Sequence, residues 1–144
     1  MKDLRLDRQL CFAVYSASHA FTRFYKPLLA QLGVTYPQYL TLLTLWEEDA
    51  LSVTAIGDRL LLDSGTLTPV LKRLEALGLV SRTRSTTDER QVIVRLTEQG
   101  AAMRHVAESF PTRILDASEC SDEELDALRQ ALTGLRKNLD QAAA

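Results

Sequence analysis

Residues 60–80 read LLLDSGTLTPVLKRLEALGLV, and residues 88–97 read DERQVIVRLT. In the first stretch apolar residues recur every three or four positions, which is the period of one helix face. Asp63 or Ser64 is placed to cap this helix, and Gly78 is placed to end it. The second stretch alternates β-branched residues with polar ones, as a strand does. We therefore predict a helix that is followed closely by a strand.

The residues next to these two stretches complete a larger unit. A short helix that starts at Ser52 or Thr54 precedes the helix above, and only Leu62 and Asp63 separate the two. Residues 79–83 and 91–96 form two strands, joined by the polar tip 84–90. Two short helices with a tight turn, followed by a hairpin, predict a winged helix-turn-helix.

Longer helices flank this unit on both sides. Helical periods predict helices over 7–32, over 36–46 with Leu40, Leu43 and Trp46 facing inward, over 97–115, and from the capping box at Ser121–Glu124 to Leu139. The fold class expected is mainly α with a small β-hairpin wing. The broad apolar stripes of the terminal helices need a partner surface, and a second copy is the simplest one. We expect dimerisation helices at 1–34 and 99–144, and a DNA-binding domain at 35–98.

The charge is distributed unevenly along the chain. The formal net charge is −2. Residues 52–95 carry seven basic and five acidic side chains, whereas residues 116–144 carry seven acidic and three basic ones. A basic central region and an acidic C-terminal region are expected of a dimer that binds nucleic acid on one face and repels it on the other. Ordinary scatter of surface charge explains the same numbers.

The candidate DNA-binding residues lie at the start of the second short helix and on the hairpin tip. Hydroxyl and basic side chains there can donate to bases or phosphates, and tip arginines can reach the backbone or a narrow minor groove. The candidates are Ser64, Thr66, Thr68, Lys72, Arg73, Arg84 and Arg90. Asp88 is placed to form a salt bridge with Arg90 that fixes the wing. Helix capping is the alternative role for Ser64, and an ordinary surface position is the alternative for Arg90.

The sequence does not indicate a membrane protein, a secreted protein, a disulfide scaffold or a metalloprotein. No apolar run is long enough to span a membrane, and no signal peptide is recognisable, so we expect a cytoplasmic protein. Two distant cysteines do not make a disulfide scaffold, and with only two histidines no metal-ligand cluster is visible. We expect no cofactor, no metal and no enzymatic activity.

The two cysteines are the remaining side chains with distinctive reactivity. Cys11 stands near the start of the first helix, where the helix dipole and phenolic hydrogen bonds favour a thiolate. Peroxides oxidise the thiolate to a sulfenic acid. Cys120 directly precedes the Ser121 capping box, another helix N-terminus. The alternatives are a small buried residue for Cys11, and for Cys120 a bystander thiol or a thiol capped by a small thiol compound.

Both quoted stretches resemble those of MarR-type regulators, and the resemblance covers essentially the whole chain. It implies a homodimeric winged-helix repressor on a pseudo-palindromic operator in double-stranded DNA, with Arg90 in the minor groove. LDRQLCFAVY at 6–15 and TYPQY at 35–39 look like the OhrR branch, the organic hydroperoxide sensors. That resemblance implies that Cys11 is peroxidatic, that Tyr25 and Tyr36 of the partner subunit hydrogen-bond its sulfur, and that Cys120 resolves it as an intersubunit disulfide.

Three other functions remain open at this point. One is a MarR-type repressor that a small aromatic ligand releases from DNA, with Cys11 inert. Another is a thiol peroxidase, although it leaves the wing unexplained and only Arg8 supplies a positive charge near Cys11. The third is a dimerising scaffold without DNA, which salt-dependent duplex binding would exclude.

Overall fold

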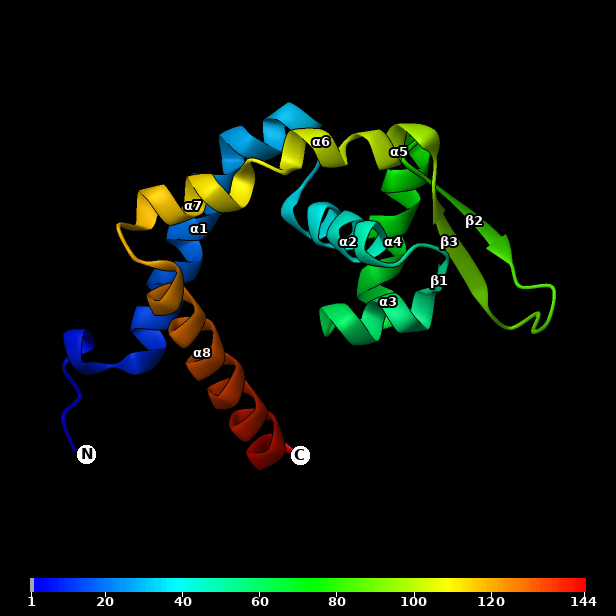
Figure 1. Cartoon of the computed structure of the whole chain (residues 1–144). Coiled ribbons are helices and arrows are strands. Elements are labelled where there is room, and N and C mark those ends of the chain that lie inside the picture. The colour runs from blue at the N-terminus through cyan, green and yellow to red at the C-terminus, as the bar shows by residue number, and fades with distance from the viewer. Residues whose placement is uncertain (1) are drawn as a thin grey trace. The chain divides into compact units, whose positions relative to one another are not determined.

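The computed structural model describes residues 2–144, which form helices and one small sheet (Figure 1). A 3-10 turn, η1, precedes the first helix. The elements are η1 Leu6–Arg8, α1 Leu10–Leu32, α2 Tyr36–Glu47, β1 Leu51–Ser52, α3 Val53–Leu60, α4 Ser64–Ala76, β2 Val80–Arg84, β3 Val92–Leu96, α5 Glu98–Ala102, α6 Arg104–Ala107, α7 Phe110–Ser118 and α8 Asp122–Ala143. The chain divides into two compact units, and the boundary in the sequence falls between Ala107 and Glu108.

Side-chain caps set the ends of α3 and α4, the helix-turn-helix pair. The Ser52 hydroxyl accepts a hydrogen bond from the Ala55 backbone N–H at 3.1 Å, and the Asp63 carboxylate accepts one from Thr66 at 2.7 Å. Helix N-termini leave such donors unsatisfied without a cap. The turn between the helices passes close to α3, because a Cβ on Gly57 would lie 2.7 Å from the Leu62 carbonyl oxygen. A glycine is therefore required at that crossing.

The core of the first unit lies where α2, α3, α4 and the sheet meet. Leu67, Leu71 and Leu74 are fully buried on one face of α4, as the helical period predicts. Leu43 of α2 was predicted to face inward, and this prediction is wrong because Leu43 is exposed. Leu42 and Leu45 are buried in its place. The apolar period of α2 is ambiguous because leucines occupy more than one of its faces.

The wing is a sheet of three antiparallel strands in the order β1-β3-β2. Val80 pairs with Leu96 at one end of the β2–β3 ladder, and Arg84 pairs with Val92 at the other. The predicted hairpin is confirmed, but the sequence did not predict β1. This strand has only two residues, too few for a period-two pattern, and its partners on β3 lie about forty residues away.

Residues 97–115 were predicted as one helix, and this prediction is wrong. The structure divides this region into α5, α6 and α7. At Met103 the carbonyl accepts from Val106 in a tighter, 3-10-type bond at 3.1 Å. Pro111 sits in the first turn of α7, where its missing N–H is harmless; a continuous helix would place it in the interior and disrupt the turn before it.

Candidate nucleic-acid interface and sensor thiols

The start of α4 presents small polar side chains to solvent. Ser64 and Thr66 are exposed, and Thr68 is half-buried. The Thr68 hydroxyl donates to the Ser64 carbonyl at 2.6 Å, so its oxygen retains acceptor capacity. Hydrogen bonding from Thr66 lowers the pKa of Asp63, which therefore caps this end as a carboxylate.

The two basic residues of α4 have different surroundings. Lys72 and Arg73 are both exposed. Arg73 also lines a groove together with residues of α1 and α2, among them Tyr25 and Tyr36. The structure thus brings Arg73 to the same groove as the tyrosines, an arrangement that the sequence did not predict.

The wing tip is held by hydrogen bonds within itself. The Asp88 carboxylate accepts from the Arg90 backbone N–H at 3.1 Å and from its guanidinium at 3.3 Å. The Arg84 guanidinium donates to the Glu89 carbonyl at 2.8 Å. Figure 1 shows the β2–β3 turn extending beyond the helices of its unit. A preorganised basic tip of this kind is suited to a DNA groove.

An ion pair that the sequence reasoning missed joins the wing to α4. The Arg82 guanidinium donates to the Glu75 carboxylate at 3.1 Å, which lowers the pKa of Glu75. Glu75 lies on α4 and Arg82 on β2. Both residue types are common on surfaces, so only the tertiary structure reveals the pair. The contact links the two elements proposed to touch DNA.

Cys11 is the second residue of α1 and is exposed. Among residues 2–144, no group is recorded as hydrogen-bonded to its sulfur. The whole stretch from Leu10 to Phe21 is exposed, and Leu10, Tyr15 and Phe21 expose more than half of their surface. The sulfur therefore lies in an exposed, largely apolar stretch of α1.

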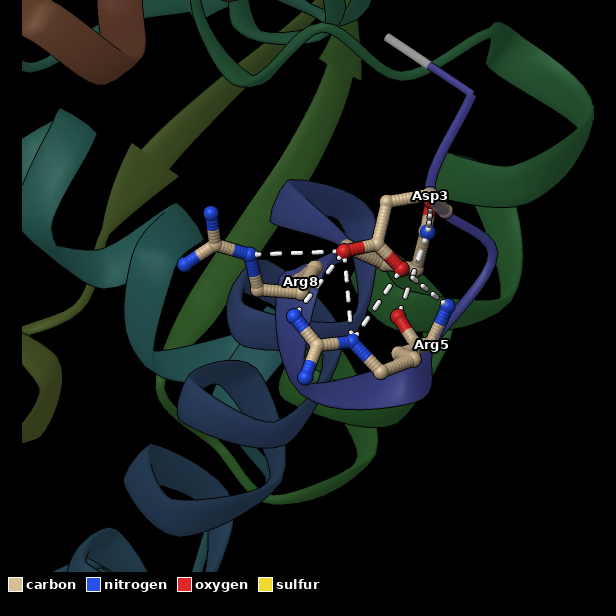
Figure 2. Close-up of polar contacts among 4 residues, drawn as sticks. Asp3, Arg5 and Arg8 are labelled. Carbon is tan, nitrogen blue, oxygen red and sulfur yellow. Dashed lines mark hydrogen bonds and ion pairs between the residues drawn. The ribbon is translucent and has the colours of Figure 1, made fainter.

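Figure 2 shows the turn that precedes Cys11. The Asp3 carboxylate accepts from the Arg5 backbone at 3.0 Å and from the Arg5 guanidinium, and Arg8 Nε lies 3.7 Å from it. The hydrogen bonds from Arg5 lower the pKa of Asp3. Arg8, the one base close to Cys11 in sequence, is thus paired with a carboxylate.

Cys120 lies in the second unit, between the end of α7 and the Ser121 cap of α8. It is half-buried, and its thiol points to the Ser118 carbonyl, with 3.4 Å between Sγ and the oxygen. Glu119, in the left-handed region at φ 56°, ends α7 just before it. Both cysteines are free thiols in this structure.

Tyr25 and Tyr36 lie next to each other. Their ring centroids are 5.1 Å apart, and Tyr39 packs against both. Tyr25 is buried, whereas Tyr36 is 42% exposed. Burial raises the pKa of all three phenols, most strongly that of Tyr25, so they are protonated donors at neutral pH.

A groove of about 670 Å³ opens beside these tyrosines. Its walls come from the second half of α1, the turn to α2, the start of α2 and one residue of α4. Tyr25 and Tyr36 line it together with three cations, Arg23, Lys26 and Arg73.

The described part of the chain offers neither a membrane-spanning helix nor a cluster of metal ligands. No helix between residues 2 and 144 combines the length and apolar character that a membrane crossing needs. No three potential metal ligands gather at one place among these residues.

The chain matches known proteins over most of its length. Residues 23–106 match the family model described as transcriptional regulator SarA/Rot. The organic hydroperoxide resistance transcriptional regulator of Bacillus subtilis (strain 168) is 50% identical over 138 residues, which are 96% of this chain and 94% of that protein.

Among solved structures, AbfR of Staphylococcus epidermidis is similar in several states. Reduced AbfR bound to DNA is 41% identical, with a TM-score of 0.82 and complete coverage of both chains. Overoxidized AbfR bound to DNA is 43% identical, with a TM-score of 0.78 over 94% of this chain and 96% of that one. Disulfide-formed AbfR is 44% identical, with a TM-score of 0.67 over 92% and 93%.

Proposed function

The chain is a DNA-binding transcriptional regulator of the MarR/SarA family, and we propose that it is a redox-sensing repressor. Its reduced homodimer binds a pseudo-palindromic operator in the cytoplasm. An organic hydroperoxide oxidises Cys11, and a disulfide with Cys120 of the partner subunit releases the DNA. The observation that carries the proposal is the exposed Cys11 in a chain half identical to an organic hydroperoxide regulator.

The proposed DNA contacts combine α4 with the wing. Ser64, Thr66, Thr68, Lys72 and Arg73 of α4 would face the major groove or its phosphates, and Arg84 and Arg90 would reach the backbone or minor groove. The exposure of all of these except the half-buried Thr68 supports this assignment. Arg73 lies toward the end of α4 and beside the groove, so we expect it to contact a phosphate rather than a base edge.

The proposed dimer uses residues 1–34 and 99–144, of which the first residue lies outside the described part. Two separate apolar surfaces support it. The start of α1 is exposed throughout, and α8 exposes Leu128, Leu132 and Leu139. Large exposed apolar patches mark association surfaces, and a second copy of the chain is the simplest partner for each.

The proposed sensing chemistry has two steps. The Cys11 thiolate attacks the outer oxygen of the hydroperoxide, so an S–O bond forms, the O–O bond breaks, and the alkoxide takes a proton to leave as an alcohol. The Cys120 thiolate of the partner subunit then attacks the Cys11 sulfur, and the displaced hydroxide leaves as water. The first step oxidises sulfur by two electrons and reduces the peroxide by two.

The partner's Tyr25 and Tyr36 would donate hydrogen bonds to the sulfur. Their ring centroids lie only 5.1 Å apart, which supports a shared acceptor, and phenols are protonated donors at neutral pH. Disulfide formation requires the two sulfurs to come within about 2 Å. We propose that this movement changes the spacing of the two α4 helices, which must match half-sites a fixed distance apart.

The test is an operator gel shift with and without cumene hydroperoxide on wild type, Cys11→Ser and Cys120→Ser. Wild type should leave the DNA and form a covalent dimer on non-reducing gels. Cys11→Ser should stay bound. Cys120→Ser should be oxidised at Cys11 but form no covalent dimer and keep the operator, in line with overoxidized AbfR on DNA. Release of Cys11→Ser by the hydroperoxide would refute the sensor; release of Cys120→Ser would refute only the disulfide step.

A second candidate is release by a small aromatic ligand with Cys11 inert. The groove supports this alternative, since its volume lies within the range of about 300–1,000 Å³ usual for ligand sites. In that case Cys11→Ser would respond to inducer as wild type does, and hydroperoxide would leave both proteins bound.

A further inference from the structure

Pro69 lies inside α4, where helix energetics disfavour a proline. It is the sixth residue of a helix that begins at Ser64. A proline in a helix interior donates no backbone hydrogen bond, so the Gly65 carbonyl four residues earlier lacks its usual donor. Pro69 is exposed, so packing within its own chain does not offset this cost. Residues that break a local rule in this way are expected at functional surfaces.

The direction in which Pro69 points follows from the buried face of α4. Leu67 and Leu71 are fully buried, and they stand two residues before and two residues after Pro69. Successive residues of an α-helix are about 100° apart, so a step of two residues rotates the side chain by about 200°. Pro69 therefore points away from the core, in the middle of the α4 face that is open to a DNA groove.

Two cations lie on either side of this direction. Lys72 and Arg73 follow Pro69 by three and four residues, which places them one turn further along α4, about 60° to one side and about 40° to the other. Both are exposed. Cations in these positions can bind phosphates on the two sides of a groove, and phosphate contacts fix the register of a protein on DNA. The residue between them is then held against the base edges.

The pyrrolidine ring of Pro69 carries neither a hydrogen-bond donor nor an acceptor. On the major-groove edges of the four bases, the C5-methyl group of thymine is the one apolar group. An apolar ring gains free energy by covering this methyl group. If the ring covers a cytosine instead, the N4 amino group is left without a partner, which costs free energy. The ring therefore favours thymine.

We propose that Pro69 reads one thymine in each operator half-site through its C5-methyl group, and that it is a specificity-determining residue. This inference rests on the proposed function, which places α4 in the major groove, and deepens it by naming a base that the helix reads. The contact involves no charge, so the thymine preference should not change with salt, in contrast to the phosphate contacts.

The experiment measures the affinity of the reduced protein for labelled operator duplexes by fluorescence anisotropy. In each duplex one symmetry-related pair of thymines, one in each half-site, is replaced by deoxyuridine, which lacks only the methyl group. At one such pair the replacement should weaken wild-type binding about tenfold, and Pro69→Ala should lose less than about threefold there. At the other pairs the two proteins should lose affinity equally.

Two features of the variants keep this comparison interpretable. Pro69→Ala restores the donor to the Gly65 carbonyl and introduces a better helix former, so the variant should fold. Pro37→Ala is the matched control, because Pro37 is an exposed proline at the start of α2. It should respond to deoxyuridine as wild type does at every pair.

A methylated cytosine supplies a second readout. At the sensitive pair, 5-methylcytosine opposite guanine should bind wild type more tightly than unmethylated cytosine does, and Pro69→Ala should show a smaller difference. A deoxyuridine effect that Pro69→Ala leaves unchanged at every pair would overturn the inference. An equal reduction at all pairs would also overturn it, because it indicates a general displacement of α4.

The same titrations separate this inference from the proposed function. If the reduced wild type binds the operator no better than a duplex of scrambled sequence, the proposed operator recognition fails. If it prefers the operator but no thymine pair responds to deoxyuridine, only the role of Pro69 fails. Because the protein stays reduced throughout, neither outcome depends on the cysteines.

Discussion

Arg90 Nε lies 3.3 Å from the Asp88 carboxylate, while 93% of the Arg90 side chain remains exposed. The same carboxylate oxygen accepts the Arg90 backbone N–H at 3.1 Å. One aspartate thus fixes both the backbone and the base of the side chain, and leaves the guanidinium edge open. An exposed ion pair adds little to the free energy of unfolding, so its value lies in presenting Arg90.

Arg90→Ala should weaken operator binding about tenfold and reduce the slope of log affinity against log salt concentration by about one. The reason is the loss of one cation at the DNA surface. Fluorescence anisotropy with labelled operator at several salt concentrations measures both quantities. Lys137→Ala is the control and should leave both unchanged, whereas wild-type affinity and slope in Arg90→Ala would exclude Arg90 from the interface.

Asp88→Ala should weaken operator binding less than Arg90→Ala does, and the salt slope should stay at or above that of wild type. The cation remains in this variant, but it must be ordered on binding, which costs side-chain entropy. The same anisotropy titrations compare the two variants. A larger loss in Asp88→Ala than in Arg90→Ala would mean that the tip needs Asp88 to fold at all.

Local sequence signals predicted much of the fold. Asp63 and Ser121 cap helices as expected, and Gly78 follows the end of α4 in the left-handed conformation. These signals span a few residues and depend on backbone donors nearby. β1 was missed because its pairing depends on residues distant in the sequence. The Asp49 carboxylate, for example, accepts from Leu96 N–H at 2.9 Å beside this pairing.

The sequence predicted which residues form the candidate site, but not how those residues are arranged in space. Sequence reasoning selected the cysteines, tyrosines and wing arginines because their chemistry fits sensing and DNA binding. It did not place Arg73 and Tyr36 at one groove or pair Arg82 with Glu75, because both arrangements join different helices and strands. The groove was not predictable for the same reason, because α1, α2 and α4 each supply part of its lining.

Gly100→Ala should lower the free energy of unfolding by about 3 kcal/mol or more. A Cβ at this position would lie 2.0 Å from the Leu79 carbonyl oxygen, and backbone atoms cannot move aside easily. Urea denaturation followed by the fluorescence of Trp46, whose indole donates to the Gly100 carbonyl at 2.9 Å, measures the change.

Gly134→Ala is the matched substitution for that experiment. No atom lies within 4 Å of its added Cβ, and Gly134 is inside α8. Alanine should stabilise the helix by about 0.5–1 kcal/mol. Equal effects of the two substitutions at one protein concentration would contradict the close crossing at Gly100.

The buried phenols predict a loss of stability in alkaline solution. Burial, with repulsion from Tyr39 and Tyr36, raises the pKa of Tyr25 above that of an unfolded tyrosine. The resulting stabilisation is complete below about pH 10 and declines above it, because only the unfolded chain can then ionise this phenol. Urea titrations at about pH 8 and about pH 10.5 measure the decline.

Tyr25→Phe should show a smaller decline than wild type between these two pH values, since it lacks the ionising group. If Tyr25→Phe and wild type lose stability equally, the phenol does not carry the effect.

The uncovered start of α1 has a genetic consequence. In the proposed homodimer the partner subunit covers this stretch. Each functional regulator therefore contains two copies of the chain. A variant that pairs normally but cannot react would form mixed assemblies with normal copies. Such an allele should therefore behave as dominant, holding target genes silent under peroxide stress even where intact protein is present.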